Sequence, residues 1–88
     1  MPVISQFYGI IIRMYFNDDE MHNTHHFHAR YSGSEASFDF EGNVIIGSFP
    51  YKQEKLVAAW AVLHSDELEA LWQLMKEEGE FFKIRGLE

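Results

Sequence analysis

Four of the five histidines in this chain of 88 residues lie close together, at His22, His25, His26 and His28. Imidazole changes its charge near neutral pH and is the commonest metal ligand in proteins, so any acid-base or metal chemistry is expected here. One residue separates His26 from His28, which places both side chains on the same face of an extended strand. Such a pair holds zinc or another divalent ion when a third ligand converges on the same point.

The other groups that could complete a metal site come from later parts of the chain. Asp39 and Glu41 follow on the next predicted strand, where they would lie across from the histidine pair and orient the imidazoles. The fifth histidine, His64, falls between Trp60 and Leu68 in the apolar stripe of a predicted helix. We therefore expect His64 in the core, on the far side of the sheet, where one subunit cannot bring it to the pair.

Two interpretations of the histidine strand stay open. The strand either holds a metal or catalytic site, or it is a polar face that charge pairs stabilise and that binds a partner. In both cases we expect one patch at the working surface, while His64 is structural. Asp39, expected opposite His28, favours the charged imidazole and would make the patch sensitive to pH. The patch consists of His26, His28, Arg30, Asp39 and Glu41.

Length and composition indicate a single folded domain over residues 1–88. Hydrophobic residues make up 47% and aromatic residues 16% of the chain, which excludes intrinsic disorder. Cysteine is absent, which excludes thiolate chemistry and suits a reducing compartment. No secretory signal and no apolar run of roughly 20 residues is present, so we expect a soluble cytoplasmic protein. The net charge of −7, from 14 acidic and 7 basic residues, argues against direct nucleic-acid binding.

Alternation of apolar and polar residues predicts an antiparallel meander of about four strands. Residues 4–16 are β-branched and aromatic on both faces, as in an interior strand. A polar loop follows over residues 17–24, and half-buried strands are predicted over residues 26–31 and 35–40. A further strand over residues 44–49 ends at a proline.

The turn between the two half-buried strands determines which residues face each other. A two-residue turn at Gly33-Ser34 agrees with the alternation on both sides, and a slip by one residue would invert one strand. The predicted pairs are Ala29 with Phe38, His28 with Asp39, and His26 with Glu41.

Apolar residues recur every three or four positions in the C-terminal half, which predicts a helix. Residues 51–78 predict one long amphipathic helix, or two with a break near Ser65-Asp66, and Gly79 is a typical C-cap. The tail over residues 81–87 alternates enough for a short final edge strand. The sequence thus predicts an α+β domain, in which an antiparallel sheet of about four strands carries a long C-terminal helix on one face.

Segments along nearly the whole chain carry the motifs of a known family. They are Met1–Ser5, Phe7–Met14, His26–Ala29 with Tyr31, Gly47–Pro50, Trp60, His64 with Glu67-Leu68, Trp72 and Phe82–Ile84. On these residues the chain resembles the small bacterial family known as domain of unknown function 4160. Thr24 and His25 stand where family members commonly carry two prolines, so the segment that leads to the histidine strand is less rigid here.

The resemblance implies a partner and no particular activity. Genes of this family often lie beside a second small gene, of domain of unknown function 2442, in a layout similar to toxin-antitoxin pairs on mobile elements. The resemblance therefore implies a bacterial cytoplasmic protein that binds the product of a neighbouring gene.

From these observations we expect a protein-interaction module, one half of a small two-protein pair. The alternative is a histidine-dependent or metal-assisted hydrolase or nuclease that uses His26 and His28, with His64 as a less favoured ligand and zinc as the candidate cofactor. The acidic net charge favours the module, because an enzyme that cleaves RNA usually needs a basic groove to collect its substrate.

Self-association as a homodimer is also expected. Several apolar side chains fall on faces that one helix cannot cover, and a small monomer seldom leaves a contiguous apolar patch in water. These residues are Ile11, Tyr15, Val44 and Ile46.

Overall fold

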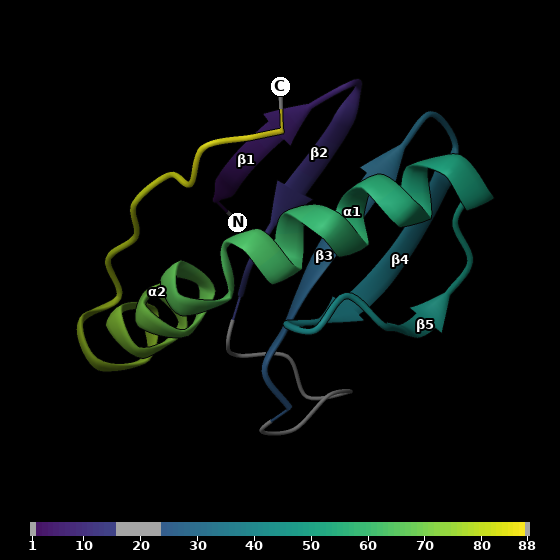
Figure 1. The fold of residues 1–88 in the computed structure, drawn as a ribbon. Coiled ribbons are helices and arrows are strands. Elements are labelled where there is room, and N and C mark those ends of the chain that lie inside the picture. The colour runs from purple at the N-terminus through teal and green to yellow at the C-terminus, as the bar shows by residue number, and fades with distance from the viewer. Residues whose placement is uncertain (1, 16–23, 88) are drawn as a thin grey trace.

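The computed structural model describes residues 2–15 and 24–87, and it confirms the α+β class. Five strands form one antiparallel sheet in chain order, which is a meander with one strand more than predicted (Figure 1). The strands are β1 (Val3–Phe7), β2 (Ile10–Arg13), β3 (His26–Tyr31), β4 (Ser34–Asp39) and β5 (Val44–Gly47). His22 and most of the predicted loop over residues 17–24 lie outside the described residues.

The N-terminal segment that was predicted as one strand forms two. β1 and β2 are a hairpin in which Phe7 pairs with Ile10, and the turn residues have a φ of 50° at Tyr8 and 78° at Gly9. Apolar side chains on both faces of residues 4–16 conceal this turn, because Tyr8 is not a typical turn former and only Gly9 marks it. As a result β1 takes the edge of the sheet and β2 is the interior strand.

The β3–β4 hairpin turns at Ser32-Gly33, one residue earlier than predicted. Ser32 accordingly has a positive φ of 55°. Moving the turn by one residue shifts the register by two, which changes every partner but keeps each side chain on its predicted face. The predicted pairs Ala29–Phe38, His28–Asp39 and His26–Glu41 are therefore wrong. The observed pairs include Ala29 with Ala36, Phe27 with Phe38, His28 with Ser37, and His26 with Asp39.

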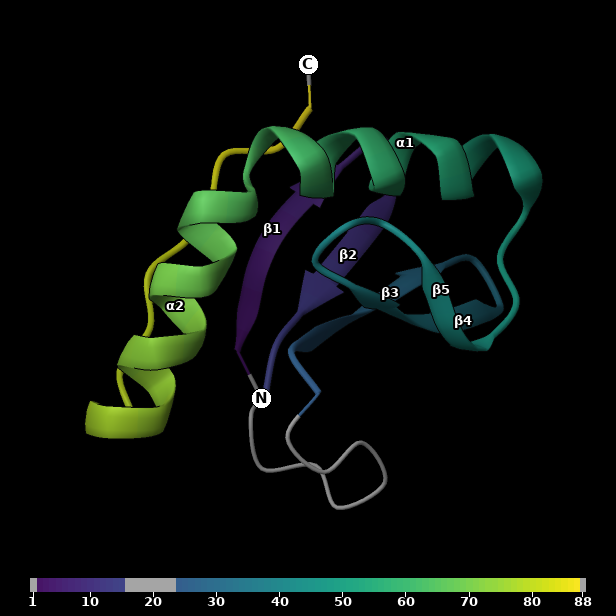
Figure 2. The same cartoon turned by 60° about the horizontal axis from the view of Figure 1, so that its bottom comes forward.

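Two helices, α1 (Tyr51–Leu63) and α2 (Ser65–Glu78), stand in place of a single long one. His64 separates them, next to the predicted alternative break: its N–H donates to the carbonyl of Trp60 and its own carbonyl accepts from Leu68. Figure 2 shows α1 lying across the sheet and α2 turning away from it beside β1. Gly79 ends α2 in the left-handed conformation, with a φ of 68°, as predicted for a C-cap. Within residues 2–15 and 24–87, no helix has the length and apolar character to cross a membrane.

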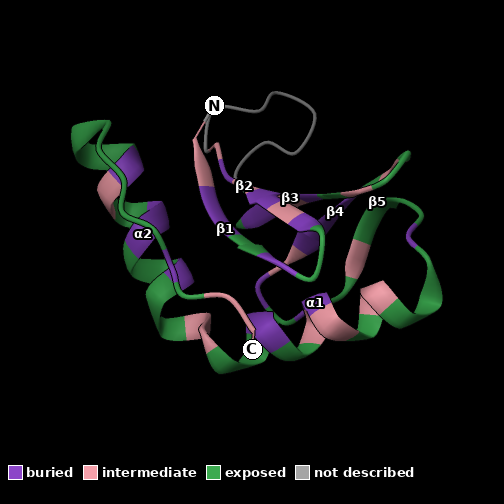
Figure 3. Ribbon diagram, turned by 90° about the horizontal axis from the view of Figure 1, so that it is seen from above, coloured by how far each residue is buried: buried purple, intermediate pink, exposed green. Residues whose placement is uncertain are grey.

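The core lies between the sheet and the apolar stripes of the helices, where the buried segments of Figure 3 face one another. Trp60 of α1 is its centre, with ring centroids 5.5 Å from Phe7 and 5.4 Å from Phe27. Phe27 stacks on Phe38 of the neighbouring strand at 5.5 Å. One layer of aromatic rings thus joins β1, β3 and β4 to α1.

The predicted final strand does not form. The C-terminal tail instead runs beside β1 as irregular chain, held by a 2.7 Å hydrogen bond from the N–H of Ile84 to the carbonyl of Ile4. The indole of Trp60 also donates to the carbonyl of Arg85 at 2.9 Å. One such hydrogen bond to β1 does not make the tail a strand, but the tail still covers the outer edge of β1.

Candidate functional site

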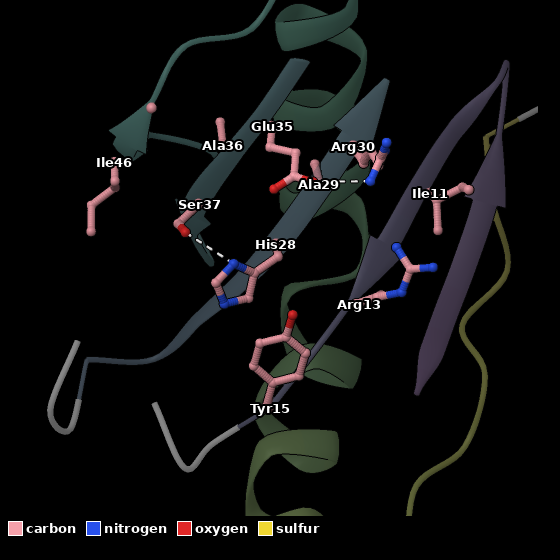
Figure 4. A pocket seen from close by; sticks show the side chains of 11 residues that line it. Ile11, Arg13, Tyr15, His28, Ala29, Arg30, Glu35, Ala36, Ser37 and Ile46 are labelled. Atoms are coloured by element: carbon pink, nitrogen blue, oxygen red, sulfur yellow. Dashed lines mark hydrogen bonds and ion pairs between the residues drawn. The ribbon is translucent and has the colours of Figure 1, made fainter. Parts of the chain in front are cut away.

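The sheet has a second face, opposite the core, and a hollow lined by charged and polar side chains lies on it. Because side chains alternate along each strand, β2 and β3 send every second residue to this side, which we call the open face. A hollow of about 220 Å³ occupies its middle. Figure 4 shows the side chains that line it, which include Ile11, Arg13, Tyr15, His28, Arg30, Glu35, Ser37 and Ile46.

His28 occupies the centre of the hollow and is held from two sides. Its Nδ1 shares a 3.1 Å hydrogen bond with the hydroxyl of Ser37, its partner across the β3–β4 ladder. The ring of Tyr15, which follows β2, stacks on the imidazole at a centroid distance of 4.6 Å. These two contacts fix the plane of the imidazole ring in the hollow.

Two arginines border the hollow, and they differ in their partners. Arg30 forms an ion pair with Glu35 directly across the ladder, with 3.2 Å between its Nη1 and the carboxylate Oε1. Arg13 makes no hydrogen bond or ion pair with any residue in the described part of the chain. Figure 4 shows the guanidinium groups of both arginines on the side of the hollow nearest β2.

His26 differs from the prediction, because it is fully buried. It is the first residue of β3, where its ring meets Trp72 of α2 edge-on at 5.5 Å and His28 at 5.1 Å. Its Nδ1 donates to the carbonyl of Thr24 at 2.7 Å. His26 is therefore not part of the expected surface patch, since Trp72 of α2 covers it, although its ring adjoins that of His28.

Asp39 and Glu41 also have another role than the one expected. The Asp39 carboxylate accepts hydrogen bonds from the backbone N–H groups of Glu41 and Asn43, both at 2.9 Å, and from the Asn43 side chain at 3.1 Å. These bonds close the turn between β4 and β5. The expected pairing of Asp39 with His28 is wrong, and Glu41 is an exposed turn residue.

His64 lies at the helix junction and is half-buried, not enclosed in the core. Its Nδ1 is 2.6 Å from Oε1 of Glu67, and its ring lies 5.7 Å from Trp60. No described contact connects it to His26 or His28. Within residues 2–15 and 24–87, no group of three or more metal-binding side chains comes together, so the proposed three-histidine site is not assembled there.

Sequence reasoning missed Arg13, Glu35 and Ser37 as candidate site residues. The signal was available, because Arg13 and Tyr15 alternate with the apolar residues Ile12 and Met14 and must face the opposite side. Val44 was expected on an uncovered face, but it packs against the core. The candidate site therefore extends from β2 to β5, with His28 at its centre.

His25 is a further contact that the sequence did not reveal. Its ring stacks on Trp72 at a centroid distance of 4.8 Å, and its Nδ1 is 2.7 Å from the carboxylate of Glu69. Both partners belong to α2, so this histidine ties the start of β3 to the second helix. It is a structural residue beside the site and does not line the hollow.

Comparison with known proteins supplies the family but no activity. Neither the curated proteins nor the solved structures contain a match to this chain. A family model described as a domain of unknown function, DUF4160, matches residues 9–73. This stretch includes β2 to β5, α1 and most of α2, and with them the whole hollow. The chain belongs to the family of domain of unknown function 4160.

Proposed function

We propose that this chain is a protein-interaction module, one half of a toxin-antitoxin-like pair on bacterial mobile DNA, and that it binds the product of a neighbouring gene in the cytoplasm. The observation that supports this function is the open face, which α1 and α2 leave uncovered. Apolar side chains at Ile11 and Ile46 flank a polar centre on this face, and Ile46 is 45% exposed. A mixed apolar and polar surface of this kind is typical of protein–protein interfaces.

Co-purification with the neighbouring gene product tests the proposal. We expect a stable complex of defined stoichiometry, which Ile46→Glu weakens because the substitution places a charge in the apolar part of the interface. The matched control is Val62→Glu, at a residue of α1 that is 62% exposed on another surface. Absence of a complex, or equal weakening by the two variants, would contradict the proposal.

A second candidate is a histidine-dependent hydrolase or nuclease, and one observation favours it. His28, Arg13 and Glu35 line the same hollow, so one site holds groups suited to proton transfer and to phosphate binding. Turnover of an RNA oligonucleotide by the isolated chain, lost in His28→Ala, would support the enzyme. For the metal-assisted version, zinc binding tighter than micromolar must disappear when His26 and His28 are both replaced by alanine.

A further inference from the structure

The hollow on the open face differs in charge from the rest of the molecule. The chain carries 14 acidic and 7 basic residues, but the charged side chains that line the hollow are Arg13, Arg30 and Glu35, together with the titratable His28. Tyr15 and Ser37 line the same hollow, and the Ser37 hydroxyl is bonded to Nδ1 of His28. Two arginines thus stand against one carboxylate on this part of the surface.

The ion pair within the hollow leaves one arginine in excess. Arg30 and Glu35 offset each other's charge, although solvent screens them because their side chains are 55% and 69% exposed. Arg13 is half-buried beside Ile11 and makes no polar contact with the described residues. A guanidinium group presents a rigid, planar set of donors that matches a carboxylate with two parallel hydrogen bonds.

We propose that the hollow binds a carboxylate from an acidic, partly apolar segment of the protein partner, with Arg13 as the principal donor. This inference rests on the proposed function, and it specifies which chemistry the partner presents. Ile11 lies beside Arg13 on β2, and Ile46 lies across the hollow on β5, so both can contact the aliphatic part of the bound segment. His28, held by Ser37 and Tyr15, forms the floor of the site.

A protein carboxylate fits this site better than a nucleic acid does. A net charge of −7 repels an extended polyanion, and the few cations of the hollow cannot follow a phosphate backbone. A short segment with one or two carboxylates needs only the local excess of donors. Its apolar neighbours also gain contact with the isoleucines, which a phosphate backbone does not.

The test is an NMR titration of isotope-labelled protein with a capped peptide that holds two glutamates between isoleucines. The chemical shifts of the backbone amides report binding. We expect shifts at the amides of Arg13, His28 and Ser37, and about tenfold weaker binding by the matched peptide with glutamine for glutamate, because charged hydrogen bonds are lost. The variant R13Q should weaken the glutamate peptide to the same extent. R13K, which keeps the charge but not the paired donors, should give an intermediate affinity.

A matched variant and a second ligand make the test decisive. Lys55→Gln removes one positive charge from α1, next to Tyr51 and away from the hollow, so it should leave peptide binding unchanged. Equal weakening by Lys55→Gln and R13Q would reduce the effect to overall charge and overturn the proposal. Absence of peptide binding would overturn it as well. So would an RNA oligonucleotide that binds more tightly than the peptide and loses affinity in R13Q. If R13Q instead captures the partner as well as wild type does, the interaction module stands and the carboxylate site falls.

Discussion

His26 and His28 lie on the same strand with one residue between them, and their surroundings give them different roles. The imidazole of His26 is enclosed by Trp72 and bonded to the backbone of Thr24, so it contributes to the packing of α2 against the sheet. The imidazole of His28 borders the open hollow between Tyr15 and Ser37. A histidine motif that looks uniform in sequence is thus divided between structure and surface.

This division predicts unequal costs of alanine substitution. His26→Ala leaves a cavity and an unpaired Thr24 carbonyl, so we expect the free energy of unfolding to fall by about 2 to 4 kcal/mol. His28→Ala removes a half-buried ring and its hydrogen bond with Ser37, and should cost about 1 kcal/mol. Chemical denaturation of the two variants measures the difference. Equal losses would mean that both histidines are structural or that both lie on the surface.

Gly47 is a second residue whose role follows from local geometry. It ends β5 beside the hollow with a φ of 87°, and a β-carbon there would lie 2.6 Å from the carbonyl oxygen of Glu35. Both the backbone conformation and the close approach therefore require glycine at this position. Glu35 belongs to β4, the strand that pairs with β5. The close approach of Gly47 to the Glu35 backbone therefore also helps to position the Arg30–Glu35 ion pair.

We expect Gly47→Ala to lower the free energy of unfolding by about 2 to 3 kcal/mol, because alanine is strained at this φ and must displace the β4 backbone. Gly33→Ala is the matched control, since nothing lies within 4 Å of its β-carbon position. Its effect should stay within about 0.5 kcal/mol. A comparable loss for both variants in thermal unfolding would contradict the contact with Glu35.

At the scale of elements, alternation predicted the faces of the sheet correctly and the turns incorrectly. Phe27 and Ala29 are buried and Arg30 is exposed, as the period of two requires. The turns at Tyr8-Gly9 and Ser32-Gly33 each use a non-glycine residue with positive φ, which sequence composition does not indicate. For this reason the core could be predicted, while the register and the number of strands could not.

The helix break was harder to predict than the helices themselves. The apolar stripe from Val57 through Trp60 and Leu68 to Trp72 continues across His64 at the spacing of one uninterrupted helix. We attribute the break to tertiary contacts. The change of direction at His64 allows Trp72 of α2 to meet Phe40, at 5.9 Å, and the rings of His25 and His26. The burial of His26 depends on this bend and was missed for the same reason.

We therefore expect Trp72→Ala to loosen α2 locally. Trp72 supplies the ring contacts of α2 with the sheet, whereas α1 is anchored separately through Trp60. Amide hydrogen exchange should become faster over Ser65–Glu78 and change little over Tyr51–Leu63. Uniform acceleration in both helices would instead show that they unfold as one unit.

At the scale of the whole molecule, the sheet separates a side with an aromatic core from a side that carries the polar hollow. Five strands give an area that α1 covers on one face only, and among residues 2–15 and 24–87 no helix lies over the other face. The sequence predicted this uncovered face from Ile11, Tyr15 and Ile46. It did not predict that Arg13 and Arg30 line one hollow, because this depends on the register in which β2 pairs with β3.

The same face should mediate self-association when no other partner is present. Two copies that meet through their open faces bury Ile11 and Ile46 of each copy, which favours a homodimer. Each copy carries a net charge of −7, so the two copies repel each other, and salt screens this repulsion. Homodimerisation should therefore strengthen as the salt concentration rises, whereas binding of an acidic partner should weaken.

Sedimentation equilibrium at about 50 and 500 mM salt, where the screening length falls severalfold, measures this dependence. We expect a dissociation constant for the homodimer that is lower at the higher concentration. Ile46→Glu should keep the chain monomeric, and Val62→Glu should not, since Val62 lies on α1 away from the open face. A monomer under both conditions would restrict the open face to the partner protein. A dimer that dissociates with salt, or that only Val62→Glu disrupts, would place the self-association surface elsewhere on the molecule.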